Sequence, residues 1–295
     1  PMPSTRDLRR RIKSIRNTSQ ITKAMQMVAA AKMRKAQQAA LAGRPYATLM
    51  NEVLAEVAAN AGDFTHPLME VREIRKRAVI VVSTDKGLCG ALNSNLLREA
   101  VKFHKDTTIY LTAGRKASQF VARTKRQLAA EFTYKDAPLF SEARAISRLA
   151  QELFIKGEAD AADILFTNFI STLVQKPEVR SLLPVGEIKA VHAELEEGPA
   201  ESFKLLKGAT EFLFEPGADQ VLGGLLPHYL NFQVYQILLE AKASEYSARM
   251  VAMKNATDNA NQLIKDLTLE YNKLRQANIT KELLEITTAQ MAMGN

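Results

Sequence analysis

Two long stretches without glycine or proline lie at the two ends of the chain. They cover residues 4–42 and residues 228–293. Glycine and proline are the residues that most strongly interrupt helices, so their absence over such lengths predicts two long helices. At ~1.5 Å per residue the second helix would be about 99 Å long, which is more than the core of a globular domain requires. The sequence therefore predicts a helical rod.

Apolar residues recur every three or four positions in both stretches, although a strict heptad is interrupted between Ile15 and Ile21. The recurring residues are Leu8, Ile12, Ile15, Ile21, Met25, Val28, Met33, Ala36 and Ala40 near the start, and Ala248, Ala252, Ala256, Ala260, Leu263, Leu267, Tyr271 and Leu274 near the end. Such spacing is typical of helices that pack along one face. Each long helix is therefore expected to have a partner helix.

The middle of the chain has the pattern of an α/β domain. Short β-branched or apolar runs predict strands, and the segments between them predict helices. The expected strands are residues 78–82, 108–111 and 164–170, and the expected helices are residues 92–104 and 141–154. Alternation of this kind favours β-α-β units and a largely parallel sheet. Because the chain should enter and leave a compact domain at neighbouring points, the two terminal helices are expected to run antiparallel.

Shorter segments flank this domain. After a break at Gly43–Pro45, residues 46–60 are expected to form a further helical piece, while Pro177, Pro184, Gly186, Gly208 and Pro216 indicate short strands and loops before the last helix.

The net charge of +8 is concentrated at one end of the chain. Residues 1–40 hold ten basic residues and one acidic residue, so the rest of the chain is close to neutral. A basic segment of this kind admits a nucleic-acid-binding function. Residues 228–295 hold seven basic and seven acidic residues, which instead predicts a solvated helix with paired charges.

Features of enzymes and metal sites are weak. The single cysteine, Cys89, excludes an internal disulfide and a cysteine-based metal cage. The four histidines, His66, His104, His192 and His228, lack metal-ligand spacing. The loop at residues 87–90 resembles a phosphate cradle but matches neither the dinucleotide nor the Gly-Lys-Ser/Thr motif. We therefore expect no cofactor and no metal, and we interpret Asp85 and Lys86 as turn and surface residues.

Several blocks of sequence resemble the gamma subunits of rotary ATP synthases. They are RIKSIRNT at residues 11–18, ITKAMQMVAAAKM at 21–33, DKGLCG at 85–90, ASEYSARMVAMKNATDNA at 243–260 and YNKLRQANIT at 271–280, with residues 282–286 completing the pattern. The blocks occur in the order found in the family, and together they span nearly the whole chain. Chloroplast members carry an inserted cysteine pair, so the single Cys89 favours a bacterial type without thiol regulation.

The resemblance implies an α/β fold class with three parts. A long antiparallel coiled coil would be formed by an N-terminal helix within residues 1–61 and a C-terminal helix within residues 220–295. Residues 75–215 would form a Rossmann-like, mostly parallel α/β domain.

The resemblance also implies a function and partners. The chain would be the central rotor stalk, one copy per complex and not itself catalytic, at the cytoplasmic face of a bacterial cell membrane as a peripheral protein without a membrane span. Its partners would be the alternating alpha and beta subunits, the epsilon subunit and the membrane-embedded c-ring, and not nucleic acid. The residues expected to carry torque and partner contacts are Met25, Arg249, Arg275, Gln276 and Thr280.

Two other classes of function stay open at this stage. One is a Rossmann-like enzyme with helical arms, which would bind nucleotides as an isolated chain. The other is a basic coiled coil that binds nucleic acid, although the sequence has neither interleaved aromatic residues nor a recognised reading motif.

Overall fold

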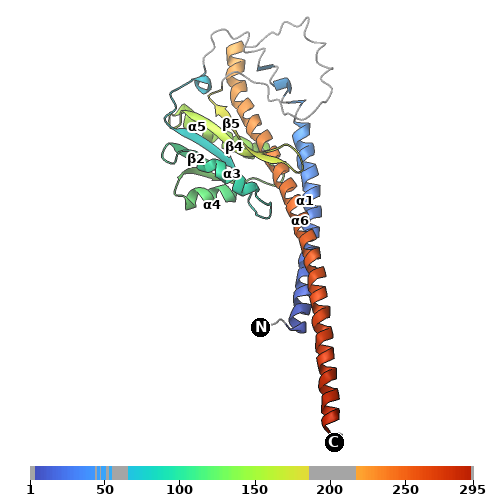
Figure 1. Ribbon diagram of the computed structural model, residues 1–295. Coiled ribbons are helices and arrows are strands. Elements are labelled where there is room, and N and C mark those ends of the chain that lie inside the picture. The colour runs from blue at the N-terminus through green and yellow to red at the C-terminus, as the bar shows by residue number, and fades with distance from the viewer. Residues whose placement is uncertain are drawn as a thin grey trace. The chain divides into compact units, whose positions relative to one another are not determined.

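The computed structural model of this chain describes residues 4–43, 45–46, 48–50, 53–54, 66–185 and 217–293. The chain divides into two compact units, one made of residues up to Ala30 with those from Arg249 onward, and the other of Ala31–Ala248. Two helices, α1 (Thr5–Ala42) and α6 (Ala218–Met293), contribute to both units (Figure 1). Most of the predicted helix at 46–60, together with Gly186, His192, Gly208 and Pro216, lies outside the described residues.

In the helical unit, α1 and α6 pack antiparallel, as predicted. Three pairs of side chains define their register: Arg9 with Tyr271, Ser19 with Asn261, and Thr22 with Thr257. The residue number falls along α6 as it rises along α1, which is the signature of antiparallel pairing. Each pair joins positions whose numbers add up to nearly the same value, so the two helices keep one register along this length.

The seam between the helices differs in part from the predicted stripe. Leu8 is buried as the spacing requires, but the next buried positions of α1 are Ser19, Thr22 and Ala29, which the stripe did not include. Ile21 and Val28 point outward and are 60% and 56% exposed. On α6, Leu263 is likewise exposed, while Met253, Thr257, Ala260 and Leu267 are buried. Where the apolar spacing is interrupted after Ile15, the seam therefore continues through two small polar residues, Ser19 and Thr22.

The α/β unit contains one five-stranded sheet with the order β3-β2-β1-β4-β5. The strands are β1 (Arg77–Val82), β2 (Thr108–Ala113), β3 (Gln127–Phe132), β4 (Ala161–Phe169) and β5 (Gln175–Leu183). The first four pair in parallel, and β5 pairs antiparallel with β4 at one edge. The predicted, mostly parallel α/β sheet is confirmed.

Helices cover both faces of the sheet. Alternate residues of β1 point to opposite faces, so Val79 and Val81 pack with α3 (Leu92–Val101) and α4 (Arg115–Arg123). Ile80 and Val82 pack on the other face with α5 (Phe140–Ile155), the short helix η1 (Pro67–Met69) and the first part of α6. The first part of α6 is therefore built into the core of the α/β unit.

The sequence predicted some elements incompletely. It did not predict α4 or β3, and it placed the start of the last helix too late because Pro227 lies inside α6. β3 is an edge strand whose residues are mostly exposed, so it lacks the apolar run that marks β1. β5 contains Pro177, a residue that strands tolerate at an edge.

Gly114 and Gly157 offer a direct test of this packing. Both have positive φ, but a Cβ on Gly114 would lie 2.2 Å from the carbonyl oxygen of Ser83, whereas a Cβ on Gly157 would meet no atom within 4 Å. Gly157→Ala should therefore lower the free energy of unfolding by about 1 kcal/mol through backbone strain alone. Gly114→Ala should cost more, about 3 kcal/mol or above, because the backbone at Gly114, which follows β2, must also move away from Ser83, which follows β1. Urea unfolding measures both, and equal costs would contradict the close approach.

Candidate partner-contact surface

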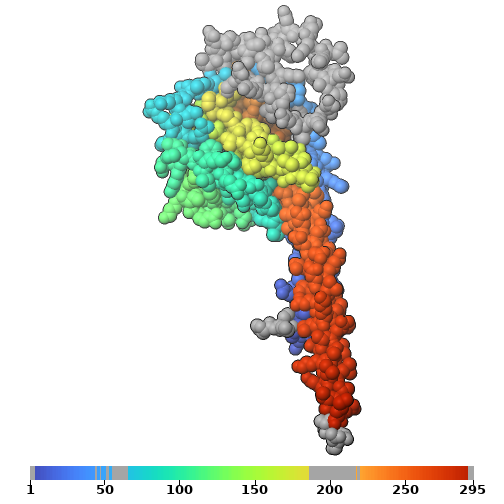
Figure 2. Space-filling view, in the orientation of Figure 1, coloured from blue at the N-terminus to red at the C-terminus, as the bar shows by residue number. Residues whose placement is uncertain are grey.

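The last part of α6 is a helical segment with its whole surface exposed. Residues 275–291, which we call the α6 tip, are exposed at every position. Of the three register pairs, the one nearest the start of α1 joins Arg9 to Tyr271, and the α6 tip follows Tyr271 along α6. Figure 2 shows this part of α6, in red, bare of other described segments in that view. The tip carries the exposed apolar residues Ile279, Leu283, Leu284, Ile286 and Met291.

Three of the predicted contact residues lie at the beginning of the tip. Arg275, Gln276 and Thr280 are all exposed. The hydroxyl of Thr280 donates a hydrogen bond to the carbonyl oxygen of Gln276 at 3.0 Å, one turn earlier on the same helix. The guanidinium of Arg275 and the amide of Gln276 can therefore be presented to a partner by a rigid helical backbone.

The other two predicted contact residues lie at a second level. Met25 on α1 and Arg249 on α6 are both half-buried, and Arg249 takes part in an interaction within the structure. The register of the helix pair places Met25 opposite the region of residue 255, roughly 9 Å along the axis from Arg249. Arg249 and Arg275 are separated by about 39 Å of α6 at ~1.5 Å per residue. The predicted residues thus form two groups and not one site.

An apolar patch beside Met25 was missed by the sequence analysis. Ile21, Met27 and Val28, which we call the α1 patch, are each more than half exposed. The spacing rule assigned Ile21 and Val28 to the seam because it counts apolar residues and ignores how closely helices approach. Small residues at the seam, such as Ser19 and Ala29, would have indicated the correct face.

The basic residues of α1 lie on the surface of the helical unit. Arg6, Arg10, Arg11, Lys13 and Arg16 are exposed. Arg9 is also exposed, but its guanidinium donates a hydrogen bond to the Tyr271 hydroxyl at 2.5 Å and lies over the tyrosine ring. Part of this charge therefore fastens the helix pair, and the remainder is available to acidic partners.

Polar groups beside the loop that resembles a phosphate cradle are engaged internally. Phosphates in such folds bind at the N-terminus of a helix that follows a strand. At the start of α4, the amides of Arg115, Lys116 and Ala117 donate to Asp85, Thr84 and Ser83, respectively. In the first turn of α3, after the loop, the Asn93 amide donates to the Thr84 hydroxyl and to the Cys89 sulfur. These bonds leave the α4 amides unavailable to an anion.

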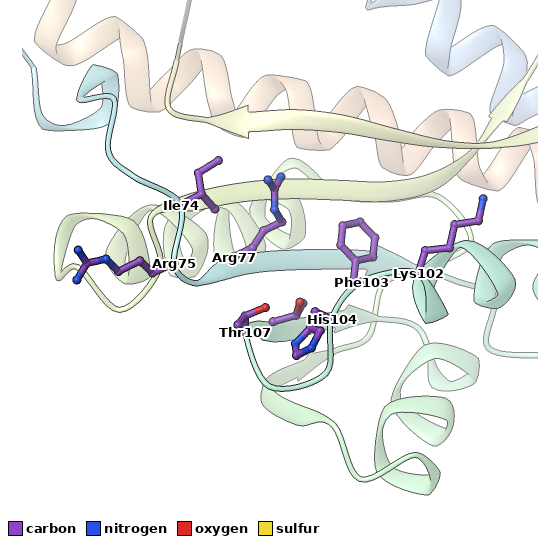
Figure 3. A pocket seen from close by; sticks show the side chains of 8 residues that line it. Ile74, Arg75, Arg77, Lys102, Phe103, His104 and Thr107 are labelled. Carbon is purple, nitrogen blue, oxygen red and sulfur yellow. The ribbon is translucent and has the colours of Figure 1, made fainter.

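A pocket of about 350 Å³ opens at the amino-terminal ends of the parallel strands, whereas the loop at residues 87–90 follows the carboxyl end of β1 (Figure 3). Its lining includes Arg77 and Thr108, the first residues of β1 and β2. Ligands of parallel α/β sheets bind at the carboxyl ends of the strands, so this is the wrong edge for a nucleotide. The basic side chains around it are paired with acidic ones, Arg77 with Asp163 and Lys102 with Glu99.

The described residues hold neither a grouped set of metal ligands nor a helix suited to crossing a membrane. No three His, Cys, Asp or Glu residues are grouped so as to hold a metal ion there. No helix in the described part of the chain has a stretch long and apolar enough to cross a membrane.

Comparisons with known proteins agree on one family. The sequence profile described as "ATP synthase" matches residues 4–293. The chain is 49% identical to the ATP synthase gamma chain of Methylacidiphilum infernorum, covering 99% of this chain and all of the relative. It is 48% identical to that of Opitutus terrae, with both chains fully covered.

Solved structures show the same fold. One chain of the mitochondrial ATP synthase of Euglena gracilis superimposes with a TM-score of 0.71 at 20% identity, covering 98% of this chain and 94% of that one. A chain from the central stalk and c-ring structure of the Tetrahymena thermophila enzyme gives a TM-score of 0.59 at 25% identity, covering 80% of this chain and 99% of that one.

The two threonine hydroxyls in the seam make a testable prediction about the helix pair. The hydroxyl oxygens of Thr22 and Thr257 lie 2.7 Å apart, and both side chains are buried. Thr22→Val and Thr257→Val should each lower the free energy of unfolding by about 1 kcal/mol. The double variant should cost less than the sum, because the single contact between the two hydroxyls is lost in either single variant and can be lost only once.

Thermal unfolding of the full chain measures the stability of the wild type, the two single variants and the double variant. Thr268→Val is the matched control, since its hydroxyl is exposed and bonds only within its own helix to Ile264. It should change the stability by less than about 0.5 kcal/mol. Strict additivity of the two seam variants would contradict a direct contact between the hydroxyls.

Proposed function

Because this chain belongs to the ATP synthase gamma-chain family, we propose that it works as the rotating shaft between an ion-driven membrane ring and the catalytic alpha and beta subunits. In this family the gamma chain is the central-stalk subunit and is not catalytic. The observation that carries the proposal is the fully exposed α6 tip, which continues a helix built into the α/β unit. Such a helix offers a partner its whole circumference.

A shaft acts on catalytic sites through differences between its own faces. Three like sites around an asymmetric helix pair meet different side chains at any moment, and rotation presents each site with every face in turn. To shift a site from 1:99 to 99:1 between two conformations requires about 5.5 kcal/mol of differential interaction. A few charge-assisted hydrogen bonds together with apolar contacts supply energies of this size.

We assign the contacts to the two levels described above. Arg275, Gln276 and Thr280 at the tip would make polar contacts that change with rotation angle. Met25 and the α1 patch would make apolar contacts at the second level, with Arg249 nearby on α6. The exposure of the tip residues and of the α1 patch supports this assignment.

The composition of these surfaces suits a contact that must slide. Buried aromatic side chains such as Trp and Tyr are typical binding hot spots, and anchors of this kind would hold a rotor at one angle. The chain has no Trp, and no aromatic residue follows Tyr271. Methionine and aliphatic residues, which adapt to varied surfaces, take their place in the α1 patch and the tip.

The partners follow from the same proposal. The helix pair would lie within the hexamer of alternating alpha and beta subunits, and the α/β unit would contact the epsilon subunit and the c-ring. The family places the chain in a membrane-associated complex. We propose that this chain is a peripheral subunit there, at the cytoplasmic face of a bacterial cell membrane and in one copy per complex. No observation on the described residues favours the nucleotide-binding or nucleic-acid-binding alternatives.

Reconstitution with alpha and beta subunits and the membrane sector tests the function. The chain should co-purify with them, and the complex should couple ATP hydrolysis to ion transport. Arg275→Ala should lower the rate of ATP synthesis by about tenfold, equivalent to one charge-assisted hydrogen bond. Lys265→Ala, an exposed α6 change outside the two contact groups, is the control. Deletion of residues 275–295 with coupling and torque unchanged would refute the tip assignment.

The α1 patch gives an independent prediction. Ile21→Ser together with Val28→Ser should leave the free energy of unfolding of the isolated chain within about 0.5 kcal/mol per change, because both side chains point to solvent. The same double variant should weaken association with the alpha and beta subunits by about tenfold through lost apolar contact. Titration of the chain into the alpha and beta subunits measures this affinity. Large destabilisation of the isolated chain would place these residues in the seam after all.

A further inference from the structure

Lys242 is a charged side chain buried inside the α/β unit. It is 2% exposed and is among the most deeply buried side chains of the described residues. Lysine is almost never fully buried unless it is paired, because removing its charge from water is costly. The position of Lys242 on α6 therefore requires an explanation in terms of its surroundings.

Three groups surround the Lys242 ammonium. The carboxylate of Glu245, itself buried, lies 3.0 Å from Nζ on the same helix. The ring of Tyr134 lies beneath Nζ, with its centroid at 4.4 Å. An Asp136 carboxylate oxygen lies at 4.0 Å. Tyr134 and Asp136 belong to the loop between β3 and α5, so two of the three groups come from outside α6.

The loop itself is fixed to the sheet and to α1. The Tyr134 hydroxyl donates to the carbonyl oxygen of Ser83, which directly follows β1. The second carboxylate oxygen of Asp136 accepts a hydrogen bond from Lys32 on α1. That hydrogen bond, together with a second one from Tyr246, lowers the pKa of Asp136 to about 2, so the carboxylate is charged at neutral pH. One loop thus contacts the sheet, α1 and α6.

Hydroxyl groups also fix the same stretch of α6 to β4 and to the turn between β4 and β5. The Ser244 hydroxyl donates to the carbonyl oxygen of Thr167 at 2.9 Å, and that of Ser247 donates to the carbonyl oxygen of Thr172 at 2.7 Å. All residues from 241 to 247 are buried. This stretch ends just before Arg249, where α6 passes to the helical unit.

We propose that Lys242, Glu245, Tyr134 and Asp136 form a lock that holds α6 at one axial and angular position in the α/β unit and so passes twisting force into the helices. The inference rests on the proposed function. The four residues, here called the Lys242 lock, are positioning residues for coupling and touch no substrate.

The lock resists slip because of the cost of an unpaired buried charge. Apolar side chains tolerate small changes of register, since one apolar contact can replace another. The ammonium of Lys242 is stabilised where it meets both the Tyr134 ring and Asp136. A shift of α6 by one turn, ~5.4 Å, would leave it buried without these partners. Buried polar groups are known to specify register in helical assemblies for this reason.

A matched pair of double variants tests the lock in the assembled ATP synthase. Lys242→Met with Glu245→Gln removes both buried charges of α6 while keeping similar volumes. Arg77→Met with Asp163→Asn removes another ion pair with a buried carboxylate, one that joins β1 to β4 and includes no residue of α6. Unfolding of the isolated chains by urea measures the stability lost by each variant, and the coupling data are compared at similar losses.

The readout is the number of ions pumped per ATP hydrolysed. The lock variant should hydrolyse ATP at a rate near that of the wild type but pump about half as many ions or fewer, because α6 slips under load. The control variant should keep the wild-type ratio. Equal loss of coupling in both variants, or none in the lock variant, would overturn the proposal.

A milder variant covers the case in which the double variant fails to fold. Asp136→Asn changes a largely exposed side chain and leaves the Lys242–Glu245 pair intact. It should assemble normally and lower the pumping ratio in the same direction, and an unchanged ratio would count against the lock. Failure of the wild-type chain to assemble or couple would instead reject the proposed function, so the two failures are distinguishable.

Discussion

The structure depends on one helix that packs into two different units. The first part of α6 contributes Leu226, Val234 and Leu238 to the core beneath the sheet, and its later part contributes Met253, Ala260 and Leu267 to the seam with α1. A helix of 76 residues keeps its backbone hydrogen bonds satisfied without help from neighbours. Side-chain packing can therefore change along α6 from a sheet to a single helix while the backbone continues unbroken.

The sequence was sufficient to predict which kinds of helix and strand form, but not which face of each one is buried. The breaker-free stretches and the run at β1 led correctly to an antiparallel helix pair and a mostly parallel sheet. The seam was partly wrong because apolar periodicity places Ile21 and Val28 inside, whereas close helix packing prefers small residues such as Ser19 and Ala29. β3 escaped notice because an exposed edge strand needs no apolar face. The contact residues came from the family resemblance, and no pattern in the residues alone would have selected Arg275 over its neighbours.

The charges of α6 illustrate a second limit of sequence reasoning. Equal numbers of basic and acidic residues in the last part of the chain predicted a solvated helix, and this holds for the tip. It fails at Lys242 and Glu245, three positions apart, which form a buried pair. Spacing of three residues indicates that two charges can meet on a helix, but it does not indicate whether water or a protein surface lies beside them. Only the packing of the β3–α5 loop against α6 distinguishes a surface pair from a structural one.

Rigid and adaptable contacts are thereby assigned to different parts of one molecule. Where α6 must not move relative to its surroundings, the structure uses buried charges and directed hydrogen bonds, whose energy falls steeply with displacement. Where the proposed partners must exchange, in the α1 patch and at the α6 tip, it presents aliphatic and methionine side chains on exposed helical surface. Dispersion and apolar contacts change gradually with position, so one such surface can meet several partners in turn without being held by any of them. A shaft needs both properties, and the residues that provide them are separated along α6.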